Sequence, residues 1–180
     1  KNTTYFFKQL VTSVNIEYQS LFYFIFPIIG ILLTRAIIRY GIKKPVNHGI
    51  PDVLYALSKR KGILPAYQMF ASLFTAPITI GFGGSTGLEG PTVSGGAGIA
   101  SNLSRLLHLN QATRSLLIGC AAAGAISAIF KATIAAIIFA IEVFSLDLTL
   151  ASLLPLLFAS ISALLTTYFF FGSTQLLPFE

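Results

Sequence analysis

Long apolar stretches alternate along the chain with short breaks that are rich in glycine, proline and basic residues. They predict about seven helical segments: residues 21–38, a short segment from residue 51, and residues 66–80, 91–108, 111–130, 134–144 and 148–171. The first would reach about 27 Å as a helix, near the thickness of a bilayer core. The pattern is typical of an all-α, polytopic membrane protein with tilted and broken transmembrane helices of unequal length.

The segment that starts at Pro51 is too short to cross a membrane. Pro51 and Asp52 suit a first helical turn, and the basic residues Lys59, Arg60 and Lys61 suit a last turn. The spacing predicts a helix of about ten residues with a cytoplasmic basic end and an N-terminus deeper in the membrane. Transport proteins use such half-length helices to place positive dipole ends at mid-membrane.

Composition agrees with a membrane protein. Hydrophobic residues make up 54% of the chain and charged residues only 10%, with a mean hydropathy of +0.79, whereas soluble domains carry about 25% charged residues. The net charge of +6 comes mostly from short loops, so it indicates membrane topology rather than nucleic-acid binding. Cys120 offers neither a disulfide nor a metal cluster and is interpreted as a small packing residue.

The sequence shows no catalytic constellation. It contains no Ser/His/Asp set in a plausible context, no Cys/His metal spacing and no Walker loop, so we expect no enzyme activity, cofactor or metal. No low-complexity run or soluble linker interrupts residues 1–180, which predicts a single domain. Because the chain starts at Lys1 and stops after Leu177-Pro-Phe-Glu180, we expect a piece of a longer protein.

The stretch with the clearest chemistry is a glycine-rich loop, Gly81-Phe-Gly-Gly-Ser-Thr-Gly-Leu-Glu-Gly-Pro91. Glycine lets a ligand approach the main chain closely. Pro91 suits the first position of a helix whose following N–H groups point back at the loop, and such a helix start favours anions. We hypothesise that a mobile anion and the Glu89 carboxylate compete for one set of backbone donors.

Each titratable residue in apolar sequence also has a purely structural interpretation. Glu89 either gates an anion site or only caps the following helix, and the clustered glycines favour the first reading. His48 either offers an N–H to an anion or is a neutral histidine bonded to a backbone carbonyl. Glu142 is interpreted as the partner of a basic residue on another helix, with a proton relay as the alternative. The other basic candidates are interpreted as turn or anchor residues at the membrane interface: Lys131, Arg105 and Arg114.

Three motifs, in order along the chain, resemble the CLC family of chloride channels and chloride/proton antiporters. Gly87-Leu-Glu-Gly-Pro91 resembles the family's Gly-x-Glu-Gly-Pro signature, and His48-Gly-Ile-Pro51 resembles its Gly-Ser-Gly-Ile-Pro motif. Residues 119–143 resemble its small-residue helix and the glutamate-bearing helix after it. The resemblance covers nearly the whole chain.

The resemblance implies a homodimer in which each subunit has its own pore, built from two inverted repeats. This chain is similar to the first repeat, and the second would lie further along the same polypeptide. The role of external gate passes to Glu89. The residues expected to line the anion sites are His48, Gly49, Ile50, Pro51, Gly87, Leu88, Glu89 and Gly90.

Three positions depart from the family pattern. His48 stands where the motif has its central serine. The identity of the preferred anion therefore stays open, and fluoride is one of the alternatives to chloride. Val143 stands where antiporters commonly carry a second glutamate, and valine cannot carry a proton. Leu88 replaces a basic residue often found before the gate. Val143 therefore favours a voltage-gated chloride channel or an uncoupled transporter over a coupled antiporter.

The expected partners are chloride or a similar anion, membrane lipid, the second repeat and a second subunit. We expect a multi-pass protein of a bacterial inner membrane. Two other classes compete with this interpretation. A cation or organic-solute transporter would need acids along its path, and only Glu89 and Glu142 are available. A membrane scaffold would leave the glycine loop and the half-length helix without a purpose.

Overall fold

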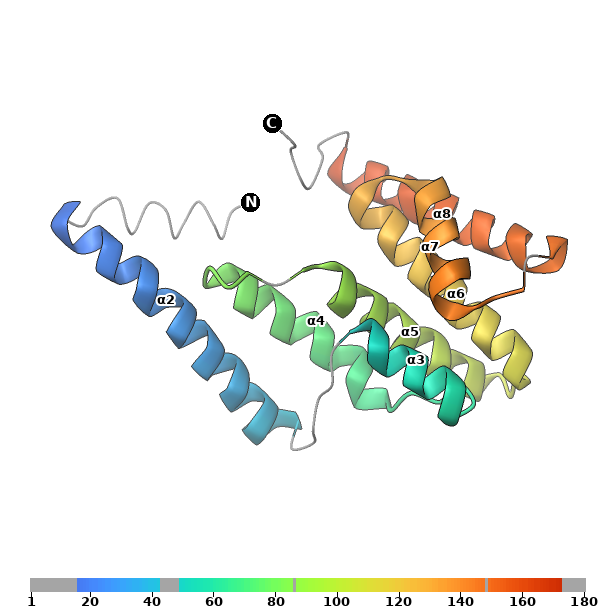
Figure 1. The fold of residues 1–180 in the computed structure, drawn as a ribbon, viewed down its shortest axis with the longest axis horizontal. Coiled ribbons are helices and arrows are strands. Elements are labelled where there is room, and N and C mark those ends of the chain that lie inside the picture. The colour runs from blue at the N-terminus through green and yellow to red at the C-terminus, as the bar shows by residue number, and fades with distance from the viewer. Residues whose placement is uncertain (1–15, 43–48, 86, 148, 173–180) are drawn as a thin grey trace. The chain divides into compact units, whose positions relative to one another are not determined.

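The computed structural model describes residues 16–42, 49–85, 87–147 and 149–172 (Figure 1). Every regular element in these ranges is a helix, which confirms the predicted all-α class. In chain order the elements are α2 (Ile16–Ala36), the π-helical continuation η1 (Ile37–Ile42), α3 (Ile50–Lys59), α4 (Ala66–Gly81), α5 (Glu89–Leu106), α6 (Gln111–Phe130), α7 (Thr133–Phe144) and α8 (Leu150–Phe171).

Predicted and observed boundaries agree best where a cap marks the helix start. α6 occupies the predicted range, and the side-chain oxygen of Asn110 accepts a hydrogen bond from the Thr113 N–H at 2.8 Å. α5 begins at Glu89, so the prediction that Pro91 opens this helix is wrong. Proline is tolerated at the third position, within the first turn, because the first four N–H groups of a helix have no intrahelical partner. α2 begins at Ile16, five residues before the apolar segment predicted from residue 21.

The chain divides into two compact units. One comprises residues 1–46 and 73–88, and the other comprises residues 47–72 and 89–180. α4 therefore begins in the second unit and ends in the first. Compact units need not be independent domains, so the single domain over residues 1–180 stays a prediction.

In the first unit, α2 lies against the end of α4. The hydroxyl oxygens of Thr34 and Thr79 are 3.2 Å apart, and the Thr79 hydroxyl also donates to the Thr75 carbonyl at 3.0 Å. A Cβ on Gly30 would clash with the side chain of Phe82. Close helix contact through a glycine and two hydroxyls is the way helices associate where lipid offers no hydrophobic driving force.

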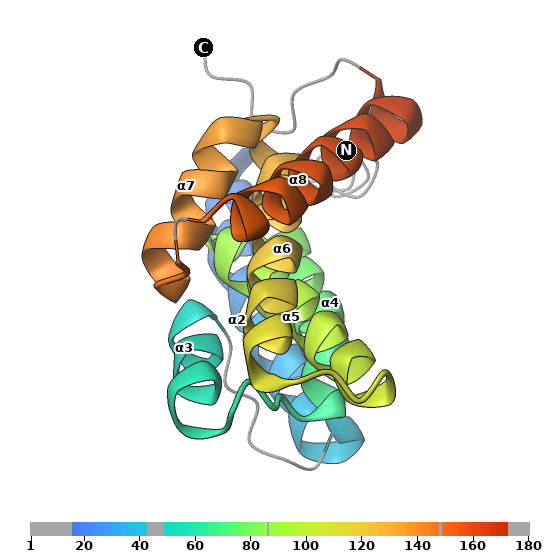
Figure 2. The same cartoon turned by 90° about the vertical axis from the view of Figure 1, so that its right-hand side faces the viewer.

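In the second unit, α6 packs against α5 and also against α7 and α8 (Figure 2). Small residues allow these close approaches, as the sequence predicted. A Cβ on Gly96 of α5 would lie 3.2 Å from the Ala121 carbonyl oxygen, and one on Gly124 would lie 3.5 Å from that of Ala159 in α8. Larger side chains at either glycine would push the helices apart.

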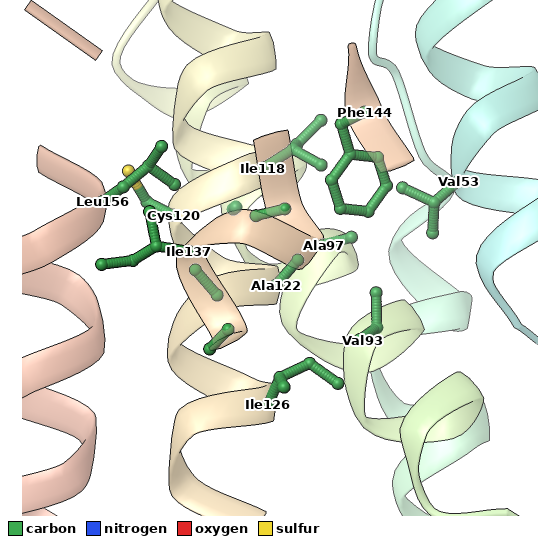
Figure 3. Packing of buried hydrophobic residues seen from close by; sticks show 14 of the residues in the cluster. Val53, Val93, Ala97, Ile118, Cys120, Ala122, Ile126, Ile137, Phe144 and Leu156 are labelled. Carbon is green, nitrogen blue, oxygen red and sulfur yellow. The ribbon is translucent and has the colours of Figure 1, made fainter. Parts of the chain in front are cut away.

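The core of the second unit draws one or more buried side chains from each of five helices. Val53 of α3, Val93 of α5, Ile118 of α6 and Leu156 of α8 are 0% exposed, and Phe144 of α7 is 7% exposed. Figure 3 shows Val53 and Phe144 on the same side of this cluster, facing α5. Cys120 is also buried here, which supports its interpretation as a packing residue.

Arg114 ties three loop and helix segments together at the start of α6. Its guanidinium donates to the Ser104 hydroxyl at 3.0 Å, to the Lys61 carbonyl at 3.0 Å and to the Leu109 carbonyl at 3.1 Å. Because these three bonds use its Nε and both terminal nitrogens, Arg114 is a structural clip as well as a basic residue near a helix end. The sequence had suggested only an interfacial anchor.

The outer surface of α8 is strongly apolar. Leu150 is 77% exposed and Phe169 is 83% exposed, whereas the helix buries Ser152, Ser160 and Thr167. α8 and α6 are the two helices in the described part of the chain that are long and apolar enough to cross a membrane. An arrangement with apolar groups outside and hydroxyls inside suits a helix whose solvent is lipid.

Candidate anion-binding site

The residue before α3 has a backbone conformation that only glycine adopts readily. Gly49 is buried and has φ 114° and ψ −177°, a region closed to residues with a Cβ. Ile50 and Pro51 then form the first turn, and no side chain caps the helix. The helix has ten residues and ends at Lys59, which confirms the predicted half-length helix with a basic last turn.

The start of α5 carries the candidate gate. Glu89 is the first residue of the helix and is half-buried. Its carboxylate forms no hydrogen bond or ion pair with any residue that the structure describes. The capping interpretation of Glu89 therefore has no support in these contacts. The N–H groups of the first turn have no intrahelical partner, and Pro91 contributes none.

The starts of α3 and α5 meet within the second unit. A Cβ on Gly90 would lie 3.4 Å from the Cα of Gly49. One turn further along each helix, Val53 and Val93 contribute to the same buried cluster (Figure 3). Two helix N-termini at one point bring together two partial positive charges and several N–H groups without intrahelical partners, which is the chemistry that binds an anion.

The predicted anion-binding residues fall into three groups. Gly49, Ile50, Pro51, Glu89 and Gly90 belong to the second unit, where the contact just described brings the two helix starts together. Gly87 and Leu88 are the last residues of the first unit. His48 lies outside the described residues.

Two of the loop glycines have a local structural reason. Gly83 has φ 84°, in the region that favours glycine. A Cβ on Gly84 would lie 2.8 Å from the Thr79 carbonyl oxygen, closer than a real Cβ tolerates. These glycines close the end of α4, so only part of the glycine cluster is left to be explained by a ligand.

The remaining sequence candidates lie elsewhere. Glu142 is exposed on α7 and pairs with no basic residue in the described ranges, so its predicted structural partner is not found there. Lys131 occupies the turn between α6 and α7, as predicted, with φ 55°. Its ammonium group donates to the Gly172 carbonyl at 3.1 Å and lies 4.6 Å from the centre of the Tyr168 ring. Among the described residues no cluster suited to a metal ion occurs.

Sequence reasoning passed over one polar residue near the two helix starts. Ser94 is 0% exposed, and its hydroxyl has no hydrogen-bond partner among the described residues. In the sequence it is one of several small residues in a helix that is rich in them. Its only distinguishing signal is its spacing, one helical turn after Gly90, which places both on one helix face.

Comparison with known proteins agrees with the architecture. The profile of the family described as voltage gated chloride channel matches residues 15–180. A putative chloride channel protein, ClcB-like, of Ralstonia nicotianae is 30% identical over 84% of this chain and 37% of its own length. Chloride channel protein CLC-e of Arabidopsis thaliana is 31% identical over 56% of this chain.

A second plant protein, CLC-f of Arabidopsis thaliana, is 30% identical over 57% of this chain and 14% of its own length. The chain thus spans little more than a third of the bacterial relative and a seventh of the plant ones. No solved structure gives a significant match. Since the family profile covers all but the first residues, the chain belongs to the voltage-gated chloride channel family.

Proposed function

We propose that this chain forms the first repeat of a chloride channel, in which the starts of α3 and α5 bind the anion and Glu89 gates it. The observation that carries the proposal is the contact between Gly49 and Gly90, where a Cβ on the second glycine would lie 3.4 Å from the Cα of the first. Relatives named as chloride channels supply the choice of anion.

The gating mechanism follows from the position of Glu89. The carboxylate is attached to the first residue of α5, so it can reach the same N–H groups that an anion would use. While it is ionised and turned inward, it competes with chloride for them. Protonation or an outward swing of the side chain leaves the donors to the anion, and several weak sites in series then allow conduction.

The proposal favours passive chloride movement over exchange with protons. Val143 lies on α7 directly after Glu142, at the position where antiporters of this family commonly have an acid. A coupled antiporter, or a channel that prefers fluoride or another anion, is the alternative. In liposomes that contain the full-length protein, an outward chloride gradient should drive no uphill proton movement. Proton uptake in proportion to chloride flux would establish the antiporter instead.

The proposed setting is a bacterial inner membrane that the complete protein crosses several times. The exposed apolar faces of α7 and α8, including Ile134 at 75% and Leu150 at 77% exposure, would face lipid or other protein. The second repeat of the same polypeptide and a second subunit are the proposed protein partners. No cofactor or nucleic acid is part of the proposal.

The direct test removes the charge of Glu89. We expect Glu89→Gln in the full-length protein to give chloride flux that no longer depends on pH, because the carboxylate can no longer vacate or occupy the donors by changing its charge. Glu142→Gln is the matched control, since it makes the same chemical change on an exposed part of α7. Unchanged pH dependence in the Glu89 variant would show that this residue is not the gate.

A further inference from the structure

Ser94 is an exception among the hydroxyl side chains of α5. The Ser101 hydroxyl donates to the Gly62 carbonyl at 2.7 Å and accepts from the Leu64 N–H at 2.8 Å, and the Ser104 hydroxyl donates to the Ser101 carbonyl at 2.7 Å. Ser94 is equally buried, but its Oγ has no partner in the described part of the chain. Buried hydroxyls normally have partners, so each exception calls for an explanation.

The position of Ser94 on the helix directs its side chain towards the meeting point of α3 and α5. Residues four apart share a helix face, so Ser94 lies on the same face as Gly90, which approaches Gly49. Helical side chains also lean towards the N-terminus and cover the turn that precedes them. The turn that precedes Ser94 contains Gly90, and Gly90 has no side chain that would block the space in front of the Ser94 hydroxyl.

Residues further along the same face support this orientation. Gly98, four residues after Ser94, approaches the start of α4, and a Cβ there would lie 3.1 Å from the Cα of Met69. Ser101, seven residues after Ser94, contacts Gly62 and Leu64 between α3 and α4. The face of α5 that carries Ser94 therefore points towards α3 and the segment after it, and away from lipid.

We propose that the Ser94 hydroxyl is a further donor to the anion, chloride or a similar halide, that binds between the starts of α3 and α5. This inference rests on the proposed function. The backbone N–H groups of the two helix starts hold one side of the anion, and the Ser94 hydroxyl donates from one turn deeper in α5. Binding of the anion gives this buried hydroxyl its partner.

The test is a chloride titration of the purified full-length protein by isothermal calorimetry, starting from chloride-free buffer. We expect Ser94→Ala to weaken chloride binding about tenfold, since a hydrogen bond to a charged group is lost. Ser160→Ala is the matched control. Ser160 is also 0% exposed with an unpartnered hydroxyl, but it lies on α8, where its carbonyl accepts from Ser127 at 2.9 Å.

Measurements on the wild type and the two serine variants distinguish anion binding by Ser94 from a packing role and from failure of the proposed anion site. Weaker binding in Ser94→Ala alone, with the melting temperature in chloride-free buffer unchanged or raised, supports the inference. Equal chloride affinity in wild type and Ser94→Ala overturns it and leaves the proposed function standing. Equal losses in both serine variants, or a lower chloride-free melting temperature in Ser94→Ala, assign Ser94 to packing and also overturn it. Absence of chloride binding in the wild type overturns the inference and the proposed function together.

Discussion

α6 and α8 begin with side-chain caps, whereas α3 begins without one. Asn110 accepts from the third residue of α6, and at the start of α8 the Ser152 hydroxyl accepts from the Thr149 N–H at 3.2 Å. α3 starts after Gly49 with no side-chain cap, and at the start of α5 the Glu89 carboxylate has no partner among the described residues. At the starts of α6 and α8 a side-chain oxygen accepts from a backbone N–H, and no side chain does so at the start of α3.

An uncapped start is not sufficient to mark a binding site. α7 starts after Ala132, which also provides no side-chain cap. Its first residue, Thr133, has its hydroxyl oxygen 3.3 Å from that of Ser127, but no second helix start is known to meet it in the described residues. The pair formed by α3 and α5 differs because the contact between Gly49 and Gly90 joins two helix starts at one place.

Of the substitutions considered, a change at Gly49 should have the largest effect on stability and chloride flux. At φ 114° and ψ −177° an added Cβ is strained, so we expect Gly49→Ala to lower the free energy of unfolding by about 1–3 kcal/mol. Chloride flux in liposomes should fall because the start of α3 can no longer hold its N–H groups in place. Gly81→Ala is the control, because a Cβ there meets nothing within 4 Å. If both variants behave like the wild type, the geometry at Gly49 does not matter to transport.

Removing the caps should lower stability without changing transport. We expect Asn110→Ala to cost about 1 kcal/mol of unfolding free energy, because the Thr113 N–H loses its acceptor. Thr149→Ala should cost about 0.5–1 kcal/mol, because it removes the hydroxyl that lies 3.2 Å from the Ser152 hydroxyl, while Ser152 can still accept from the residue 149 N–H. Asn110→Asp keeps an acceptor and should retain wild-type stability. A change in chloride selectivity in either alanine variant would contradict the division into capped and open starts.

Sequence pattern alone located the helices well, because their limits are set by local chemistry. Pro51 and the basic residues after Ser58 bound α3, and Asn110 fixes the start of α6. The start of α5 was misplaced because proline at its first position and at its third are both compatible with a helix. Local pattern cannot choose between them.

Features that depend on contacts between distant residues were not predictable. The guanidinium of Arg114 donates to the carbonyl of Lys61, and no local sequence pattern around either residue predicts that bond. The approach of Gly90 to Gly49 could be hypothesised only from the idea of two inward helix starts. Ser94 needed the structure, since burial and the lack of a partner are tertiary properties.

The most direct test of the account is to locate the anion itself. Crystals of the full-length protein grown in bromide should show an anomalous peak within hydrogen-bonding distance of the backbone N–H groups of Ile50 or Gly90. Ordered bromide found only away from the starts of α3 and α5 would contradict the account.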